Sequence, residues 1–151
     1  DQPERVYAMD VLNNVIVCAT AGRHVWVWDL RNMESPTQRR ESALKHQSRA
    51  LKIHPDEQGF TISSIEGRTA IEYFDKSPES QSKTFAFKCH RATVDKVDTA
   101  YSVNSIAFYP NEISPGIFAT GGSDKHYCIW NGPQKKRIWQ SNPVCTFLTA
   151  C

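Results

Sequence analysis

The chain has 151 residues, of which 40% are apolar and 11% aromatic, so it can bury a core and is not a wholly disordered protein. Its formal charge of +2, from 18 basic and 16 acidic residues, argues against a protein whose whole surface binds nucleic acid. No apolar run reaches the roughly 18 residues of a transmembrane helix, and the charged opening Asp1 to Arg5 argues against a secretory signal. The five cysteines are odd in number and lack Cys-x-x-Cys spacing, which favours reduced thiols over a disulfide framework or a zinc ribbon.

Short runs of β-branched and aromatic residues follow one another along the chain, with turn residues between them. In chain order the runs lie at 6–11, 15–19, 25–28, 51–53, 60–65, 70–74, 85–87, 103–108, 117–119, 127–130, 138–139 and 144–148. Alternation with period two is typical of β-strands, and a helical period is not sustained anywhere. The sequence therefore predicts an all-β chain, with at most one helical turn at 42–49. The longest expected loops lie at 33–37, 76–82, 92–100 and 110–116.

The strand pattern occurs three times. An aromatic residue followed by an acid or its amide ends a strand at Trp28-Asp29, Phe74-Asp75 and Trp130-Asn131, with separations of 46 and 56 residues. A WD-repeat propeller blade has four strands in about 40–45 residues, so each interval fits one blade with a loop insertion. We therefore expect blades at approximately 5–42, 43–90 and 101–141, and the first strand of a fourth at 144–151.

Three blades and one strand are too few to close a propeller, because propellers typically have about four to eight blades. Open ends would leave apolar faces and strand edges exposed. We therefore expect residues 1–151 to form a single partial β-propeller that belongs to a longer protein.

Several longer sequence motifs, called words here, indicate which kind of propeller the chain resembles. They are VWDLRNM (27–33), QRRES (38–42), LKHQSR (44–49), SSIEGR (63–68), FAFKCHR (85–91), YSVNSI (101–106) and TGGSD (120–124). In this order and near-register the words resemble the mitotic spindle checkpoint family of WD-repeat proteins (budding uninhibited by benzimidazoles) over about Val6 to Gln140. The resemblance implies a seven-bladed propeller of which this chain holds a middle-to-late portion.

The mRNA-export family of WD-repeat adaptors is the nearest relative of the checkpoint family. It shares the SIEGR and FKCHR words, so these cannot separate the two families. The longer words at 27–33 and 38–42 favour the checkpoint family, whereas the opening Pro3-Glu4-Arg5 slightly favours the export family.

Three cations form the candidate site: Arg49, Arg68 and Lys88. Arg68 sits in the turn between the second and third strands of its blade, Arg49 in the link into the first strand, and Lys88 near the exit of the fourth. These positions share one face of a four-stranded blade. Convergent cations repel one another, but they suit an anion such as phosphothreonine, which arginine can bind bidentately and lysine as a point charge. The alternative is that Arg68 is a solvated turn residue and Lys88 a strand-edge charge.

The resemblance to the checkpoint family implies what this site binds. Arg49, Arg68 and Lys88 match the basic residues that receive the phosphothreonine of Met-Glu-Leu-Thr repeats on a kinetochore scaffold. Arg49 also matches the arginine that pairs with an acidic residue of the GLEBS-type peptides of checkpoint kinases.

We therefore expect a non-enzymatic spindle assembly checkpoint adaptor in the nucleus and at the kinetochore, with a cytoplasmic pool. It would recruit checkpoint kinases and take part in the inhibitor assembly of the anaphase-promoting complex. We expect no cofactor, metal or membrane, and no direct contact with DNA. The alternative is an mRNA-export adaptor that binds a nucleoporin peptide and RNA.

Other polar residues favour structural interpretations. His90 ends a blade and is expected to form hydrogen bonds within it, with Asp124 capping this network from a tight turn. Lys125 stands in that turn where the family usually has glycine, at a position that needs positive φ. No metal-ligand, nucleophile-elbow or phosphate-loop spacing supports an enzyme on a propeller scaffold. Residues 135–137 form a basic run that suits a solvated hairpin.

Overall fold

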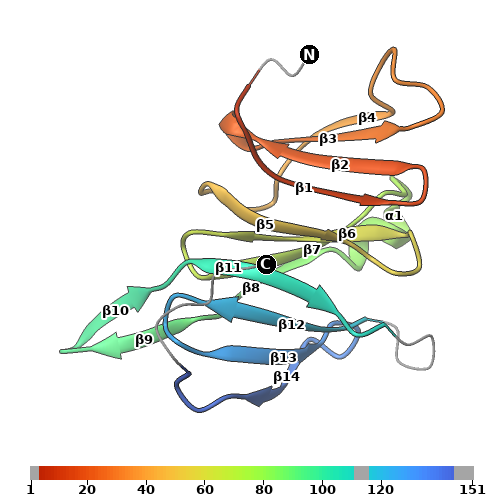
Figure 1. Cartoon of the computed structure of the whole chain (residues 1–151). Coiled ribbons are helices and arrows are strands. Elements are labelled where there is room, and N and C mark those ends of the chain that lie inside the picture. The colour runs from red at the N-terminus through yellow and green to blue at the C-terminus, as the bar shows by residue number, and fades with distance from the viewer. Residues whose placement is uncertain (1–3, 111–115, 145–151) are drawn as a thin grey trace.

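The structure is a computed structural model in which residues 4–110 and 116–144 are described. Three four-stranded antiparallel sheets follow one another along the chain, and each is a simple meander (Figure 1). The strands of the first sheet are β1 (Val6–Leu12), β2 (Val15–Thr20), β3 (His24–Asp29) and β4 (Gln38–Glu41). The second sheet holds β5 (Ser48–Ile53), β6 (Gly59–Ser64), β7 (Arg68–Tyr73) and β8 (Phe85–Lys88). The third holds β11 (Val103–Phe108), β12 (Ile117–Gly122), β13 (Tyr127–Asn131) and β14 (Lys136–Gln140).

The three sheets stack against one another as propeller blades do, which confirms the predicted all-β WD-repeat propeller fold (Figure 1). One buried cluster, which includes Val17, Val25 and Phe60, lies between the first and second sheets. A second cluster, which includes Phe118 and Trp130, lies between the second and third. The first strands lie at the inner side of the stack, because β5 contacts both β1 and β11. Burial between neighbouring blades therefore supplies the core.

The link between the second and third sheets differs from the expected loop at 92–100. It forms a two-stranded hairpin of β9 (Arg91–Val94) and β10 (Val97–Ala100) that projects from the stack (Figure 1). Its turn residues Asp95 and Lys96 have φ values of 49° and 66°. Two-residue hairpin turns with both φ positive usually have Asn, Asp or Gly followed by Gly, so Asp95 fits this turn but Lys96 replaces the usual glycine.

The short helices also differ from expectation. Residues 42–49 form no helix, whereas the expected loop at 76–82 contains α1 (Pro78–Ser82), which Ser77 caps by accepting a hydrogen bond from the Ser80 N–H. A single 3-10 turn, η1 (Ala21–Arg23), joins β2 and β3. Among the described residues, no helix has the length and apolar character needed to cross a membrane. Beyond Val144, the expected strand at 144–151 lies outside the described residues.

Candidate anion-binding site

The antiparallel order of the second sheet places the three predicted cations at the same end of that sheet. Arg49 lies at the start of β5, Arg68 begins β7 and Lys88 ends β8. Arg68 and Lys88 are direct partners in the β7–β8 register. This is the end from which the β9–β10 hairpin leaves the blade (Figure 1). The structure thus brings Arg68 and Lys88 side by side, and both side chains reach solvent.

Arg49 is oriented differently. Its side chain reaches from the innermost strand to the third sheet, where Nε donates to Asn104 Oδ1 at 3.3 Å. Asn104 in turn donates to the hydroxyl of Ser123 at 2.9 Å. Arg49 is therefore placed at the boundary between two blades, and Arg68 and Lys88 lie nearer the outer edge of one blade.

A carboxylate lies among the cations, in the turn between β6 and β7. Glu66 Oε1 is 2.8 Å from Arg91 Nη2 and 3.7 Å from Arg68 Nε, and Glu66 Oε2 is 3.2 Å from His46 Nε2. We call the group formed by His46, Glu66, Arg68, Lys88 and Arg91 the Glu66 cluster. The Glu66 carboxylate partly neutralises the neighbouring cations and so reduces the repulsion between them.

Arg91 is a member of the Glu66 cluster that the sequence analysis did not single out. Besides its ion pair with Glu66, Arg91 donates to the Glu66 carbonyl at 3.1 Å and pairs with Asp98 on β10 at 3.0 Å. Its side chain is 16% exposed, whereas that of Arg68 is 36% exposed. Arg91 therefore fastens the hairpin to the turn, and Arg68 is the more accessible guanidinium. Arg91 and Glu66 lie in the same sequence words as Lys88 and Arg68, which is the one signal that could have found them.

This arrangement can hold a dianion. A phosphate accepts charge-assisted hydrogen bonds through three oxygens, and a guanidinium can present two donors to it. Such a ligand would compete with the Glu66 carboxylate for Arg68, with Lys88 adding a point charge from the neighbouring strand.

The equivalent turn of the third sheet takes part in a buried hydrogen-bond network. His90 is buried, and its ring nitrogens lie 2.8 Å from Asp124 Oδ1 and 2.8 Å from Thr120 Oγ1. Trp130 Nε1 donates to the same threonine hydroxyl at 2.9 Å. The expected structural network of His90 and Asp124 is confirmed, with one correction. The partners of His90 belong to the sheet that follows it and not to the blade that it ends.

The turn that carries Asp124 also has the expected backbone. Lys125 adopts a φ of 70°, so the positive φ that the sequence predicted at this non-glycine residue is confirmed. The three thiols in the described residues are buried, and burial raises the pKa of each, that of Cys89 to about 12. These thiols therefore remain protonated and unreactive at neutral pH.

Comparison with known proteins supports the resemblance inferred from the sequence words. No family model matches the chain. The chain is 50% identical over 149 residues to "Mitotic checkpoint protein BUB3.1" of Arabidopsis thaliana, covering 99% of this chain and 43% of that protein. It is 46% identical over 140 residues to "Mitotic checkpoint protein bub3" of Dictyostelium discoideum, covering 91% and 41%. A "mRNA export factor" of Macaca fascicularis is 39% identical over 156 residues, covering 99% and 41%.

These relatives confirm the resemblance to mitotic checkpoint WD-repeat proteins, with mRNA-export proteins as the next relatives. The chain spans about two fifths of the length of the curated relatives that it matches. Among solved structures, the computationally designed Ika8 protein matches with a TM-score of 0.63 and 13% identity over 90% of this chain and 36% of that one. The designed Ika4 protein matches with a TM-score of 0.67 and 11% identity over 95% and 76%. Identities this low indicate a shared fold alone.

Proposed function

We propose that this chain, whose sequence resembles the mitotic checkpoint WD-repeat proteins along nearly its whole length, is the phosphothreonine-binding part of a spindle assembly checkpoint adaptor. Its ligand would be the phosphorylated Met-Glu-Leu-Thr repeat of a kinetochore scaffold. The observation that carries the proposal is the pairing of Arg68 with Lys88 at one end of the second sheet, both open to solvent.

The chemistry of the Glu66 cluster suits this ligand. Phosphothreonine brings a charge of about −1.5 to −2 at neutral pH, whereas the Glu66 carboxylate brings a single charge. The phosphate would therefore take over Arg68 from Glu66 and gain Lys88 at the same time. Arg91 has a positioning role, since Glu66 and Asp98 hold it in place beside the site.

Arg49 is proposed to serve two ligands. Its position between the second and third sheets suits the acidic residue of a GLEBS-type peptide of a checkpoint kinase lying across the face of both blades. Its positive charge at the same end of the sheet would also favour the phosphothreonine. Recruitment of checkpoint kinases to the kinetochore then follows from binding both partners on one face.

The wider setting of this proposal rests on the named relatives, which are checkpoint and mRNA-export proteins. We propose a non-enzymatic protein of the nucleus and kinetochore, with a cytoplasmic pool and a part in the inhibitor assembly of the anaphase-promoting complex. The mRNA-export alternative, with a nucleoporin peptide and RNA as ligands, has support from relatives at 39–41% identity, below the 50% of the plant checkpoint protein.

Titration of three labelled ligands against the chain tests the proposal. The ligands are a Met-Glu-Leu-phosphothreonine peptide, its unphosphorylated form and a single-stranded RNA. Each charge-assisted hydrogen bond can contribute about 1.5–3 kcal/mol, so we expect the phosphorylated peptide to bind at least about tenfold more tightly than the unphosphorylated one. A salt-sensitive RNA affinity without any effect of peptide phosphorylation would overturn the proposal in favour of the export alternative.

A GLEBS-type peptide provides the corresponding test of Arg49. We expect Arg49→Glu to weaken this peptide strongly, because it places like charges together, and to weaken the phosphopeptide less. Equal binding of the GLEBS-type peptide to both proteins would contradict the role of Arg49.

A further inference from the structure

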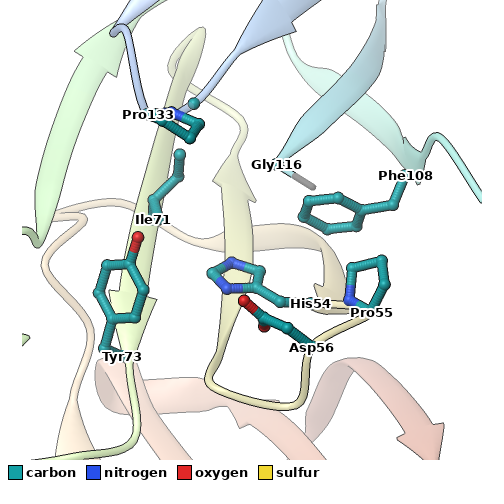
Figure 2. Close-up of a pocket in the computed structure, with 9 residues that line it drawn as sticks. His54, Pro55, Asp56, Ile71, Tyr73, Phe108, Gly116 and Pro133 are labelled. Atoms are coloured by element: carbon teal, nitrogen blue, oxygen red, sulfur yellow. The ribbon is translucent and has the colours of Figure 1, made fainter. Parts of the chain in front are cut away.

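A pocket of about 160 Å³ opens at the other end of the second and third sheets, away from the Glu66 cluster. Figure 2 shows the residues that line it, drawn from the ends of β5, β7 and β11 and from the β13–β14 turn. An engineered protein cavity of about 150 Å³ accommodates benzene, so this pocket has room for a compact group of a few heavy atoms. The pocket is made from described residues only and uses no group of the proposed anion site.

Three aromatic rings form walls of the pocket. The ring centroid of His54 lies 5.7 Å from that of Tyr73 and 5.2 Å from that of Phe108, with interplanar angles of 75° and 65°. Rings at such steep angles stand as neighbouring walls, as Figure 2 shows. Tyr73 and Phe108 are partly exposed, so a ligand can reach their rings.

The charge of the pocket is negative. Asp56 lines it beside His54, and the described residues of the lining include no lysine or arginine (Figure 2). Burial lowers the pKa of His54 to about 4, so this ring is neutral at physiological pH and does not repel a cation. Asp56 shares the pocket lining with the rings of Tyr73 and Phe108, and burial together with the negative charge of Asp56 raises the pKa of Tyr73.

We propose that this pocket binds the trimethylated side chain of a lysine in a partner protein. A quaternary ammonium group cannot donate hydrogen bonds, so it is recognised by aromatic faces and by a nearby negative charge, and this pocket combines the two. Asp56 is exposed, so its charge is open to a ligand that approaches the pocket from solvent. The charge of Asp56 attracts a lysine-rich protein segment and disfavours an anionic membrane surface, which is why we assign a protein source.

The test uses the full 151-residue chain and a short lysine-rich peptide in three forms. The central residue is trimethyllysine, unmodified lysine or the neutral tert-butyl isostere of trimethyllysine, and binding is followed by NMR titration. We expect the trimethyllysine form to bind about tenfold more tightly than either of the others, because only it combines the cation with the methyl surface.

Matched variants assign the effect to named groups. Asp56→Asn removes the charge and keeps an acceptor for the Gln58 N–H, which Asp56 Oδ1 receives at 3.0 Å. We expect this variant to weaken the trimethyllysine peptide severalfold, and Tyr73→Leu to abolish its measurable binding. Tyr73→Phe, which keeps the ring, and Glu79→Gln, on the exposed helix α1, should bind as the parent does. Circular dichroism verifies that each variant is folded.

Three results would overturn the proposal. Equal binding of the tert-butyl peptide would make the site merely apolar. Phosphatidylcholine vesicles are titrated in parallel, and stronger binding of these vesicles would make the ligand a lipid headgroup. Absence of binding to the folded parent chain would remove the site altogether. Arg68→Glu should leave trimethyllysine binding unchanged, so the outcome is independent of the proposed phosphothreonine site.

Discussion

The turn between the second and third strands has a different role in the second blade than in the third. Asp124 and Glu66 are each the second residue after the second strand of their sheet. In the third blade the acid turns inward and holds the buried His90. In the second blade it turns outward and meets Arg68 and Arg91.

The buried residues next to each turn explain this difference. In the third sheet Phe118 is paired with Trp130, whose indole completes the histidine network, whereas the matching pair in the second sheet is Phe60 with Glu72. Glu72 is buried and accepts a hydrogen bond from the Ala43 N–H at 3.1 Å. In the second blade, therefore, no buried histidine needs a hydrogen bond from the acid of this turn. Glu66 can therefore contact the surface cations Arg68 and Arg91 and hold them close together, as a site for an anionic ligand requires.

The largest expected effect on stability comes from removing His90 from its network with Asp124 and Thr120. His90→Ala leaves Thr120 and Asp124 without their partner in a mostly buried network, so we expect it to lower the free energy of unfolding by about 3 kcal/mol. Urea denaturation measures this change. His46→Ala, in the exposed corner, is the matched control, and its cost should stay within about 0.5 kcal/mol. Equal losses in the free energy of unfolding for His90→Ala and His46→Ala would contradict the proposed difference between the two blades.

The two buried histidines also sharpen the comparison, because His54 lacks the acidic hydrogen-bond partner that His90 has. Burial lowers the pKa of His54 from 6.5 to about 4, so the unfolded chain binds the extra proton between these values. Stability from this group is present above about pH 6.5 and is lost as the pH falls towards 4, by up to about 3 kcal/mol. Urea titrations at several pH values measure the loss. His54→Gln should flatten this part of the profile, and an unchanged profile would contradict the prediction.

A smaller effect tests whether Glu66 competes with the ligand. Glu66→Gln removes one negative charge from the cluster and keeps a similar shape, so we expect the phosphopeptide to bind about fivefold more tightly. The unphosphorylated peptide should bind the variant and the parent alike. Weaker binding of the phosphopeptide by the variant would mean that Glu66 supports the site by orienting Arg91.

The smallest expected effect concerns the stability of the exposed corner. Arg68→Glu alters a partly exposed side chain whose nearest carboxylate is 3.7 Å away, so it should change the free energy of unfolding by at most about 0.5 kcal/mol. Urea denaturation provides the value. A loss comparable with that of His90→Ala would show that Arg68 is structural.

Much of the fold could be predicted because period-two alternation and the aromatic–acid strand endings are local signals. The β9–β10 hairpin could not, since Lys96 adopts positive φ at the position where this turn usually has glycine. The side-by-side placement of Arg68 and Lys88 follows from strand order alone and could be predicted. The contact of Glu66 with Arg91 joins residues 25 positions apart and depends on which rotamers the packed turn allows.

The aromatic pocket was also beyond prediction. Tyr73 and Phe108 are the last residues of β7 and β11, and His54 directly follows β5, so the three rings come from two sheets. A sequence pattern gives no sign that their rings meet, because that depends on how the two blades pack.

The central claim is that Arg68 receives a phosphothreonine, and one titration tests it most directly. A labelled Met-Glu-Leu-phosphothreonine peptide is titrated against the parent chain, Arg68→Glu and Lys83→Glu, with circular dichroism to confirm that each is folded. Lys83 is an exposed cation at the other end of the same blade, beside helix α1. We predict that Arg68→Glu weakens binding at least about tenfold and that Lys83→Glu changes it less than about twofold. Unchanged affinity in a folded Arg68→Glu variant would contradict the claim.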